Sequence, residues 1–433
     1  MRRFTLAAAL VAVVAMTGPT STRAQARFDW KQAQGTEIRV LALRVWFTDH
    51  FKANLPEFER LTGVKVVFED YPEDALRQKL AVEMAARNKN IDLFQSGASL
   101  EGKRFSTSGW YADLNPLLRD ASATSPDWDQ KDFFETVWKA QQFGGQQISV
   151  PLQAVTQVMF YRKDLFDAAG LKPPKTLDEL EAAAKRLHNP PGVVGFASRG
   201  RKTQAPYSWA HFLYAHGGNW FSPDGKSGLA TSAALNATNQ YARILRAYGD
   251  PGVADNGPVE VQTLFLQGRA AIILDACSWA GIFNNPEKSK VVGKWAVAPA
   301  PAGPAGVTYE LWAWSMSVSP FSEKKRAAWL FLQWATSKEM QRPLQAKGFP
   351  MPRQSLWVDP EWRAKAEPSW LETVTTQFAS AKPIGHPSAI AAAEVVDAVG
   401  TAINGALAGK DAKAELEVAA RNVNSVVERT DKR

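Results

Sequence analysis

The sequence predicts an α/β protein of two domains, in which mostly parallel sheets carry helices on both faces. Short apolar segments suited to buried strands alternate along the chain with segments whose apolar residues recur at helical spacing. This alternation is typical of strand–helix–strand units, whose sheets are parallel. The chain has 433 residues, more than a single hydrophobic core usually organises. We therefore expect two α/β domains.

The first 26 residues are expected to be an export signal. Two arginines are followed by an apolar run over 4–16, which is too short to span a bilayer, and Ala-Gln-Ala at 24–26 matches the small-x-small pattern of a signal peptidase site. The only cysteine, Cys277, lies far from this site, so no thiol is available there for a lipid anchor. The sequence predicts a soluble mature protein that is released into a periplasm.

Three strands separated by two helices are expected at the start of the mature chain. The first helix places Phe51 and Phe58 on one face, and Gly63 can end it. In open parallel sheets, ligands bind beyond the carboxyl ends of the strands, where the strand order reverses. The loops at 44–48 and 95–99 are therefore candidate site segments. The expected strands cover 38–43, 64–68 and 91–95, and the helices cover 51–61 and 76–84.

A second α/β region is predicted from Gln157 onwards. Thr176 and Glu179 have the spacing of a capping box at the start of a helix. Thr231 and Ser322 are expected to cap two further helices. The expected elements are helices over 177–187, 232–248 and 259–267, strands over 193–196 and 270–274, a connector rich in Pro, Ala and Gly over 297–306, a helix after 322 and a helix over 390–407.

Composition and charge exclude several classes of protein. The formal net charge is +8, and three of the positive charges lie in residues 1–26, which leaves +5 without any basic run. Nucleic-acid binding is therefore not expected. One cysteine cannot form an intramolecular disulfide, and His211 and His216 are five residues apart, which does not suit a metal-binding helix face. No cofactor or metal is predicted. Sixteen tryptophans are a high count that needs an explanation.

Several motifs occur in a recognisable order. They are Gly-Val-Lys-Val at 63–66 with the strand and helix that follow, Gly-Trp-Tyr-Ala-Asp-Leu at 109–114, the stretch at 145–170 that contains VPLQAVTQVMFYRKDLFDAAG, and the segment at 265–279 that ends in Ser-Trp. Together they resemble the extracellular solute-binding proteins of family 1, the maltose-binding-protein-like components of sugar ABC importers. The resemblance extends over nearly all of the mature chain.

This resemblance implies a two-lobed periplasmic binding protein fold of the type II kind, in which hinged lobes close over a solute. The chain would cross between the lobes near 151–156, 298–301 and 334–337. The partners implied are a small carbohydrate or polyol and the permease subunits of an ABC transporter, with the protein itself a monomer. The implied division is a signal peptide at 1–26, a first lobe of 27–153 plus 300–335, and a second lobe of 154–299 plus 336–433.

Aromatic residues are the first candidates for the binding site. A sugar presents apolar faces and a rim of hydroxyls, so its site needs flat aromatic walls together with fixed donors and acceptors. Trp46 follows the first strand, and Trp279 matches a family position that stacks on sugar. Trp209 is expected to approach from the second lobe. Glu310 and Trp312 replace a turn that is usually glycine-rich in the family, which suggests a bulkier wall and a smaller or differently shaped ligand.

Polar residues complete the set of candidates. Gln95 and Ser96 end the third strand, and Gln153 and Thr156 lie in the first crossing between the lobes. By contrast, Arg353 is expected to be structural. Four further tryptophans are expected to pack in the core, at positions 110, 138, 329 and 334.

The preferred ligand is a neutral sugar or polyol, and two alternatives stay open. A phosphorylated solute such as glycerol phosphate is compatible with the positive net charge, although no cluster of Arg and Lys marks the candidate loops. A secreted glycoside hydrolase would also use aromatic walls, but it needs two opposed carboxylates, and no local motif pairs them. The sequence therefore predicts a binding protein and no enzyme.

Overall fold

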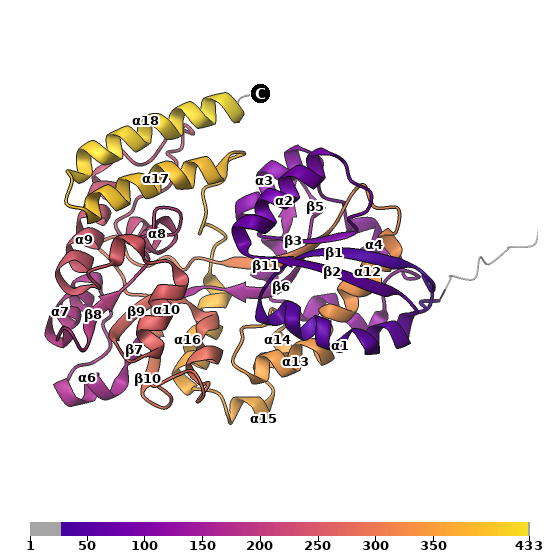
Figure 1. Ribbon diagram of the computed structural model, residues 1–433, viewed down its shortest axis with the longest axis horizontal. Coiled ribbons are helices and arrows are strands. Elements are labelled where there is room, and N and C mark those ends of the chain that lie inside the picture. Colours follow the sequence, from indigo (N-terminus) through magenta and orange to yellow (C-terminus); the bar gives the residue numbers. More distant parts are fainter. Residues whose placement is uncertain (1–26, 432–433) are drawn as a thin grey trace, which may run out of the picture.

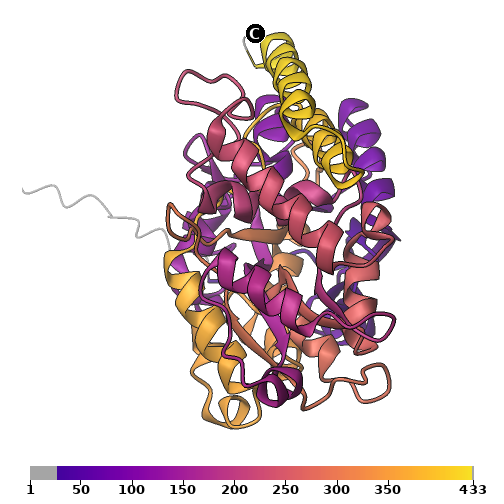
Figure 2. The same ribbon diagram turned by 90° about the vertical axis from the view of Figure 1, so that its left-hand side faces the viewer.

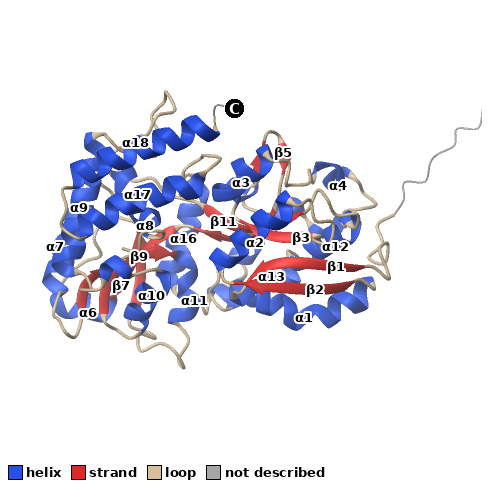
Figure 3. Ribbon diagram, turned by 45° about the horizontal axis from the view of Figure 1, so that its top comes forward, coloured by secondary structure: helices blue, strands red, loops and turns tan. Residues whose placement is uncertain are grey.

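A computed structural model describes residues 27–431, so the expected export signal lies outside the described residues. Two lobes lie side by side along the long axis of the molecule, each with its own sheet and surrounding helices (Figures 1 and 3). No helix within 27–431 is both long and apolar enough to cross a membrane.

The first lobe contains a five-stranded sheet in the order β2-β1-β3-β11-β6. Helices α1 and α12 pack on one face, and α2 and α3 lie on the other. A short hairpin and two short helices complete this lobe. The bounds are β1 (Glu37–Leu43), α1 (Trp46–Thr62), β2 (Lys65–Tyr71), α2 (Glu73–Ala85), β3 (Leu93–Ser96), α3 (Ala98–Thr107), α4 (Asn115–Arg119), α5 (Glu135–Lys139), β4 (Gln142–Phe143), β5 (Gln146–Gln147), β6 (Val150–Val155), β11 (Trp312–Val318) and α12 (Lys325–Ala335).

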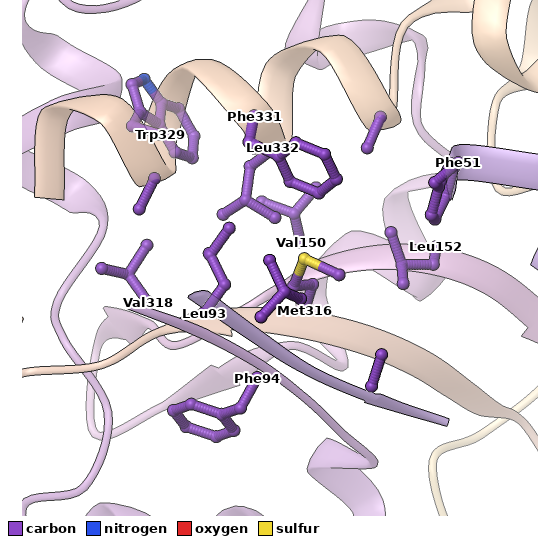
Figure 4. Close-up of a cluster of buried hydrophobic side chains, with 14 of the residues drawn as sticks. Phe51, Leu93, Phe94, Val150, Leu152, Met316, Val318, Trp329, Phe331 and Leu332 are labelled. Atoms are coloured by element: carbon purple, nitrogen blue, oxygen red, sulfur yellow. The ribbon is translucent and has the colours of Figure 1, made fainter. Parts of the chain in front are cut away.

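The alternation of side chains along these strands supplies both faces of the sheet with apolar residues. In Figure 4, Leu93 and Val318 point towards Leu332 of α12, whereas Phe94 points to the opposite side. There Phe94 packs on Phe105 of α3, with ring centroids 6.2 Å apart. Burial on both faces explains why these strands have nearly continuous apolar sequences.

The second lobe contains a four-stranded sheet in the order β10-β7-β9-β8, with helices on both faces. Figure 2 views this lobe from its outer side, with the α17–α18 pair at the top. The bounds are β7 (Gln157–Arg162), α6 (Lys163–Ala169), α7 (Leu177–Leu187), β8 (Val194–Ala197), α8 (Ala205–Ala215), α9 (Ser232–Tyr248), α10 (Pro258–Leu266), β9 (Ala270–Ala276), α11 (Ala280–Phe283), β10 (Trp295–Pro299), α16 (Pro368–Ser380), α17 (Ala392–Leu407) and α18 (Ala412–Thr430).

The two-lobed α/β class is confirmed, and in each sheet every strand but one runs in the same direction, the exceptions being β11 in the first lobe and β7 in the second. Strand β1 pairs in parallel with β2 and β3, and β8 pairs in parallel with β9, whereas β11, β7 and β10 form antiparallel pairs. The physical reason lies in the crossings between lobes. Strand β6 leaves the first lobe and β11 returns to it, so β11 runs opposite to the strands that point towards the junction.

Most local signals act where they are expected. Gly63 ends α1 with φ +69°, Thr176 accepts a hydrogen bond from the backbone N–H of Glu179 (3.1 Å), and Thr231 caps α9 in the same way. The expectation for Ser322 is wrong, because α12 begins at Lys325 without a side-chain cap. The Ser322 hydroxyl donates to the buried carboxylate of Asp92 (2.5 Å) and accepts from the backbone N–H of Lys324 (3.0 Å). The expected connector at 297–306 begins inside β10.

The division of the chain between the lobes stays a prediction. The hydrophobic core around β1 and β3 also contains Met340, Leu344 and Leu356, so segments beyond residue 335 pack with the first lobe. These segments are α13 (Lys338–Ala346) and α14 (Gln354–Trp357), whereas α15 (Pro360–Arg363) packs through Trp362 on Trp370 of α16.

Candidate ligand-binding site

A cavity of about 280 Å³ lies between the two lobes. Its walls come from four parts of the fold: the start of α2 and the loop after β3 in the first lobe, the strands β6 and β11 at the crossings, the segments after β8 and β9 in the second lobe, and the segment 381–391 that joins α16 to α17. This is the edge of the sheets at which open α/β folds bind ligands.

The first-lobe wall is organised around Arg77, one turn into α2. Its guanidinium pairs with Glu73 (Nη2 to Oε1, 2.8 Å) and with Glu101 of α3, and it lies over the indole ring of Trp314, 5.6 Å from the centroid. The backbone N–H of Gly97 donates to the same Glu101 carboxylate (2.8 Å). This network holds the loop after β3 against α2 and turns a fixed set of donors and acceptors towards the cavity.

The second-lobe wall repeats this arrangement. Arg199, two residues after β8, pairs with the buried Asp275 of β9 (Nε to Oδ2, 2.8 Å) and lies over the indole ring of Trp279, 5.8 Å from the centroid. Its Nη1 donates to Gln204 (3.2 Å). Each lobe therefore presents an arginine that is fixed by a carboxylate and stacked on a tryptophan.

Two polar side chains between these walls have unused hydrogen-bonding atoms. Glu310 is 2% exposed and Gln153 is 3% exposed, and both line the cavity. Among residues 27–431, neither Glu310 Oε1 nor Gln153 Nε2 has a hydrogen-bond partner. Burial raises the pKa of Glu310 to about 8. Buried polar atoms without partners are costly, so an acceptor and a donor that both face a cavity indicate a place for a polar ligand.

The raised pKa of Glu310 predicts a pH effect on stability. Its carboxyl group titrates near 4.5 when unfolded and near 8 when folded, so the stability that depends on its protonation is complete below pH 4.5 and is lost as pH rises to 8. The free energy of unfolding of Glu310→Gln should therefore exceed that of the wild type by an amount that grows with pH. This difference should be near zero at pH 4.5 and on the order of 4 kcal/mol at pH 8.

Urea unfolding of both proteins at a series of pH values measures this difference. Other buried groups also make the stability of the wild type depend on pH, because burial lowers the pKa of His211 to about 4 and that of His386 to about 3. The wild type is therefore compared with Glu310→Gln, which keeps both histidines. Both histidines therefore stabilise the folded protein above pH 6.5 and lose that contribution as the pH falls. A difference that stays constant across the range would contradict the pH effect assigned to Glu310.

The segment 381–391 closes one side of the cavity with Gly385 and His386. The imidazole Nδ1 of His386 lies 3.1 Å from the hydroxyl of Ser99 in the first lobe, and its ring lies 4.7 Å from that of Tyr207. Because burial lowers its pKa to about 3, His386 is neutral at physiological pH. The carbonyl of Ile384 anchors the segment by accepting from the Tyr214 hydroxyl (2.7 Å).

Four of the sequence-predicted site residues lie together in the cavity wall. They are Gln153, Trp279, Glu310 and Trp312. Strand register accounts for part of this grouping, since Gln153 of β6 faces Trp314 of β11. That these residues bind a ligand stays a prediction.

Three other candidates do not line the cavity and have structural partners. Gln95 accepts from the backbone N–H at the end of β1 (2.8 Å), and Ser96 hydrogen-bonds to the hydroxyl of Tyr111 (3.1 Å). Thr156 donates to Gln377 Oε1 (3.0 Å). These side chains hold neighbouring strands and helices together at the junction, so we leave them out of the site.

Two tryptophans lie elsewhere. Trp209 is 0% exposed in the core of the second lobe, where its indole N–H donates to Thr238 (3.0 Å). Trp46 stacks on Phe349, with ring centroids 3.7 Å apart, and lines a separate hollow beside α11. We therefore leave both out of the site as well. The tryptophans at 110, 138, 329 and 334 pack with the first-lobe core, as expected.

The sequence analysis missed several residues of the cavity wall. Arg199 follows a predicted strand, so the rule that placed the loops at 44–48 and 95–99 in the site would have found it had it been applied to that strand. Arg77 gives a weaker signal, as one of many helical arginines. No local pattern marks Tyr207 or His386. The missed residues are Glu73, Arg77, Arg199, Gln204, Tyr207, Trp314 and His386, whereas Gly97 and Ser99 lie in the predicted loop at 95–99.

Acidic side chains outnumber the arginines around the cavity. The two arginines face three carboxylates that pair with them, Glu73, Glu101 and Asp275, in addition to Glu310. No surplus of positive charge is therefore available among these groups for an anion. Within the described part of the chain, no group of three or more His, Cys, Asp or Glu side chains is arranged to hold a metal ion.

Comparison with known proteins gives consistent matches. A model of the family described as bacterial extracellular solute-binding protein matches residues 46–342. The erythritol/L-threitol-binding protein of Mycolicibacterium smegmatis is 29% identical over 376 residues, which cover 82% of this chain and 78% of that protein. The mannitol-binding protein of Pseudomonas aeruginosa is 29% identical over 278 residues, 61% of each chain.

A solved structure is similar over nearly its whole length. The crystal structure of an ABC transporter solute-binding protein from Agrobacterium radiobacter K84, in complex with ribitol, superposes with a TM-score of 0.84 at 26% sequence identity. The match covers 91% of this chain and 99% of that one.

Proposed function

This chain belongs to the bacterial extracellular solute-binding protein family, and from that membership we propose that it captures a neutral sugar or polyol in the cavity between its lobes. The similar proteins named above bind erythritol or threitol, mannitol and ribitol, all of them neutral polyols. The proposed role is binding, with no chemical change to the solute.

The size of the cavity supports a small solute. Pockets for drug-sized ligands have volumes of roughly 300–1,000 Å³, and this cavity, at about 280 Å³, lies just below that range. A polyol or monosaccharide of about four to six carbons suits such a space, whereas an oligosaccharide would need a longer groove. The bulky Trp312 and Trp314 of β11 limit the cavity on the side where the crossing strands enter it.

The single observation that carries the proposal is the pair of unused polar atoms at Glu310 and Gln153. A carboxylate oxygen and an amide N–H can accept from and donate to neighbouring hydroxyls of one polyol. Arg77 and Arg199 provide further donors at opposite walls. A polyhydroxylated solute would satisfy the groups that are otherwise left without partners.

The charge balance of the cavity disfavours the phosphorylated alternative. A phosphate group would have to compete with Glu73, Glu101 and Asp275 for two guanidinium groups that these carboxylates already pair with. Like charges in a partly dehydrated cavity repel strongly, so a neutral ligand is favoured.

We further propose that the protein acts in the periplasm after cleavage of its signal and delivers the bound solute to the permease subunits of an ABC importer. The family's extracellular role supports this location. Closure of two lobes over a solute is a common form of hinge motion in binding proteins. The closed form would be the one that docks on the permease.

Titration calorimetry against a panel of erythritol, ribitol, mannitol, the matching aldoses and glycerol 3-phosphate tests the proposal. At least one neutral compound should bind saturably and change the tryptophan fluorescence, because Trp279, Trp312 and Trp314 line the cavity. Glycerol 3-phosphate should bind at least about tenfold more weakly than the best neutral compound. Failure of every neutral compound would remove the proposed ligand class, and preference for the phosphate would favour the alternative.

A further inference from the structure

The two lobes make a second contact at the edge of the ligand cavity. Helix α3 of the first lobe meets α17 and the end of α18 of the second lobe, at the top of the molecule in Figure 1 and again side by side in Figure 3. Leu100 of α3 is buried there against Ala392 and Val396 of α17, with Tyr207 packed beside them. This cluster is separate from the three large hydrophobic cores.

Polar contacts surround this apolar cluster. Lys103 Nζ lies 2.6 Å from the carboxylate of Asp431, the residue that follows α18, and 3.4 Å from the carbonyl of Ser388. Asp431 also accepts from the backbone N–H of Ile390 (3.1 Å). One turn of α3 is thereby tied to three separate segments of the second lobe.

These contacts exist only while the lobes are together. The chain crosses between the lobes at Thr156, between β6 and β7, and again between β10 and β11, whereas α3 and α17 belong to different lobes. Rotation of one lobe away from the other would expose Leu100 and Val396 to water and would separate Lys103 from Asp431. The contact therefore contributes free energy to the closed form alone.

We propose that Leu100, Lys103, Ala392, Val396 and Asp431 form an interlobe latch that sets the affinity for the ligand. Of these residues, Leu100 also lines the cavity. This inference rests on the proposed binding function. When only the closed form holds the ligand tightly, the apparent dissociation constant is the intrinsic constant divided by the fraction of closed protein. A weaker latch lowers that fraction and so weakens the binding of every ligand by the same factor.

Three latch residues allow this effect to be separated from ligand contact. Lys103, Val396 and Asp431 do not line the cavity. Substituting them leaves the cavity wall unchanged, so the order of preference among ligands should stay as in the wild type. A change in affinity without a change in preference is the signature expected of a latch.

A charge-swap cycle at Lys103 and Asp431 tests the polar part. Lys103→Glu places two acidic groups together, and we expect about a tenfold higher Kd for the best ligand of the panel, which corresponds to about 1.4 kcal/mol. The rise should come from faster dissociation, because the latch must open before the ligand can leave. The double variant Lys103→Glu/Asp431→Lys should bind more tightly than either single variant.

The matched control is a pair within one lobe on the same helix α17. Lys202 pairs with Asp397 (2.9 Å), and both residues belong to the second lobe. Lys202→Glu should leave Kd and the dissociation rate unchanged. Equal effects of Lys103→Glu and Lys202→Glu would overturn the proposal, as would a double variant no better than the worse single variant.

Val396→Ala tests the apolar part without altering charge. We expect Kd to rise by about threefold to fivefold for all bound ligands in equal proportion, because two methyl groups no longer leave water on closure. The matched control is Val418→Ala on α18, whose side chain is exposed and lies outside the latch. An unchanged Kd for Val396→Ala would remove the apolar cluster from the latch.

Small-angle scattering of the ligand-free proteins keeps this test distinct from that of the proposed function. The latch predicts a larger radius of gyration for Lys103→Glu than for the wild type, with the double variant between them. Equal radii would overturn the latch. If no compound of the panel binds but the radii of gyration differ as expected, the proposed ligand class is overturned. The proposed latch is then still supported.

Discussion

Above about pH 8, where the Glu310 carboxyl group is ionised, Glu310→Gln is expected to weaken the binding of the best neutral ligand by about threefold to tenfold. A hydrogen bond between a hydroxyl and a charged group contributes roughly 1.5–3 kcal/mol, about twice as much as a neutral one, and every 1.4 kcal/mol is about a factor of ten in Kd. The substitution keeps the shape of the side chain while it removes the charge. The loss should therefore appear as weaker binding and not as misfolding.

The structure explains why this position has a large effect. Glu310 is fixed at the second crossing, where the backbone of its neighbour Leu311 donates to Lys382 (2.7 Å) and the backbone of Lys382 donates to Tyr309 (2.9 Å). The carboxylate therefore stays at the cavity wall without reorganisation, although its Oε1 atom has no partner within the described residues. A ligand hydroxyl that donates to Glu310 Oε1 would replace the hydrogen bond to water that this atom loses when it is buried.

Titration calorimetry of the wild type and Glu310→Gln measures the effect, with Glu361→Gln as the matched control. The Glu361 side chain is 85% exposed on α15, outside the cavity lining, and its variant should show wild-type affinity. Because the ligand favours the ionised carboxyl, wild-type affinity should also rise as the pH increases towards 8, and Glu310→Gln should lack this rise. Wild-type affinity in Glu310→Gln would exclude Glu310 from the site.

Arg353→Leu is expected to lower the free energy of unfolding by roughly 3–5 kcal/mol, the range for removing one partner of a buried ion pair. Arg353 is 0% exposed, and its guanidinium donates to the carbonyls of Trp128 (2.7 Å) and Thr336 and to the buried Asp132 carboxylate (3.3 Å). Leucine would leave these three acceptors, and the carbonyl of Asp129 to which the guanidinium also donates (3.0 Å), without this donor. The structural role predicted for Arg353 is thus confirmed.

Urea unfolding monitored by circular dichroism measures this loss, and Arg421→Leu serves as the control. Arg421 lies on the exposed face of α18, so its substitution should change the unfolding free energy by less than about 0.5 kcal/mol, as is usual for surface positions. Arg353→Lys should recover little stability, because an ammonium group cannot reproduce the planar fork that reaches several acceptors. A loss below about 1 kcal/mol for Arg353→Leu would contradict this account.

The order of the elements could be predicted because it depends on local patterns. Runs such as 38–43 and 270–274 are apolar enough to be buried on both faces, and Gly63, Thr176 and Thr231 mark helix ends by their backbone or capping chemistry. Ser322 failed as a cap because α12 begins only at Lys325, and the Ser322 hydroxyl accepts from the backbone N–H of Lys324, which precedes the helix. Local signals therefore predicted the elements more reliably than the residues at which they begin.

The candidate site could be predicted only in part. Gln153, Trp279, Glu310 and Trp312 lie beside crossings or strand ends, where motif order and strand topology both point to the cavity. Trp209 shows the limit of this reasoning, since a tryptophan in an apolar helix suits the core as well as a binding wall, and here it is in the core. Residue type alone does not distinguish the two.

By itself, the sequence determined the α/β class, the order of strands and helices and the family, because periodicity, turn chemistry and motif order are properties of the chain as it is written. Only the tertiary structure decided which polar groups meet in the cavity. Arg77, Arg199 and His386 come from three distant segments, and their charges and hydrogen bonds depend on distances of a few ångströms that no spacing in the sequence encodes.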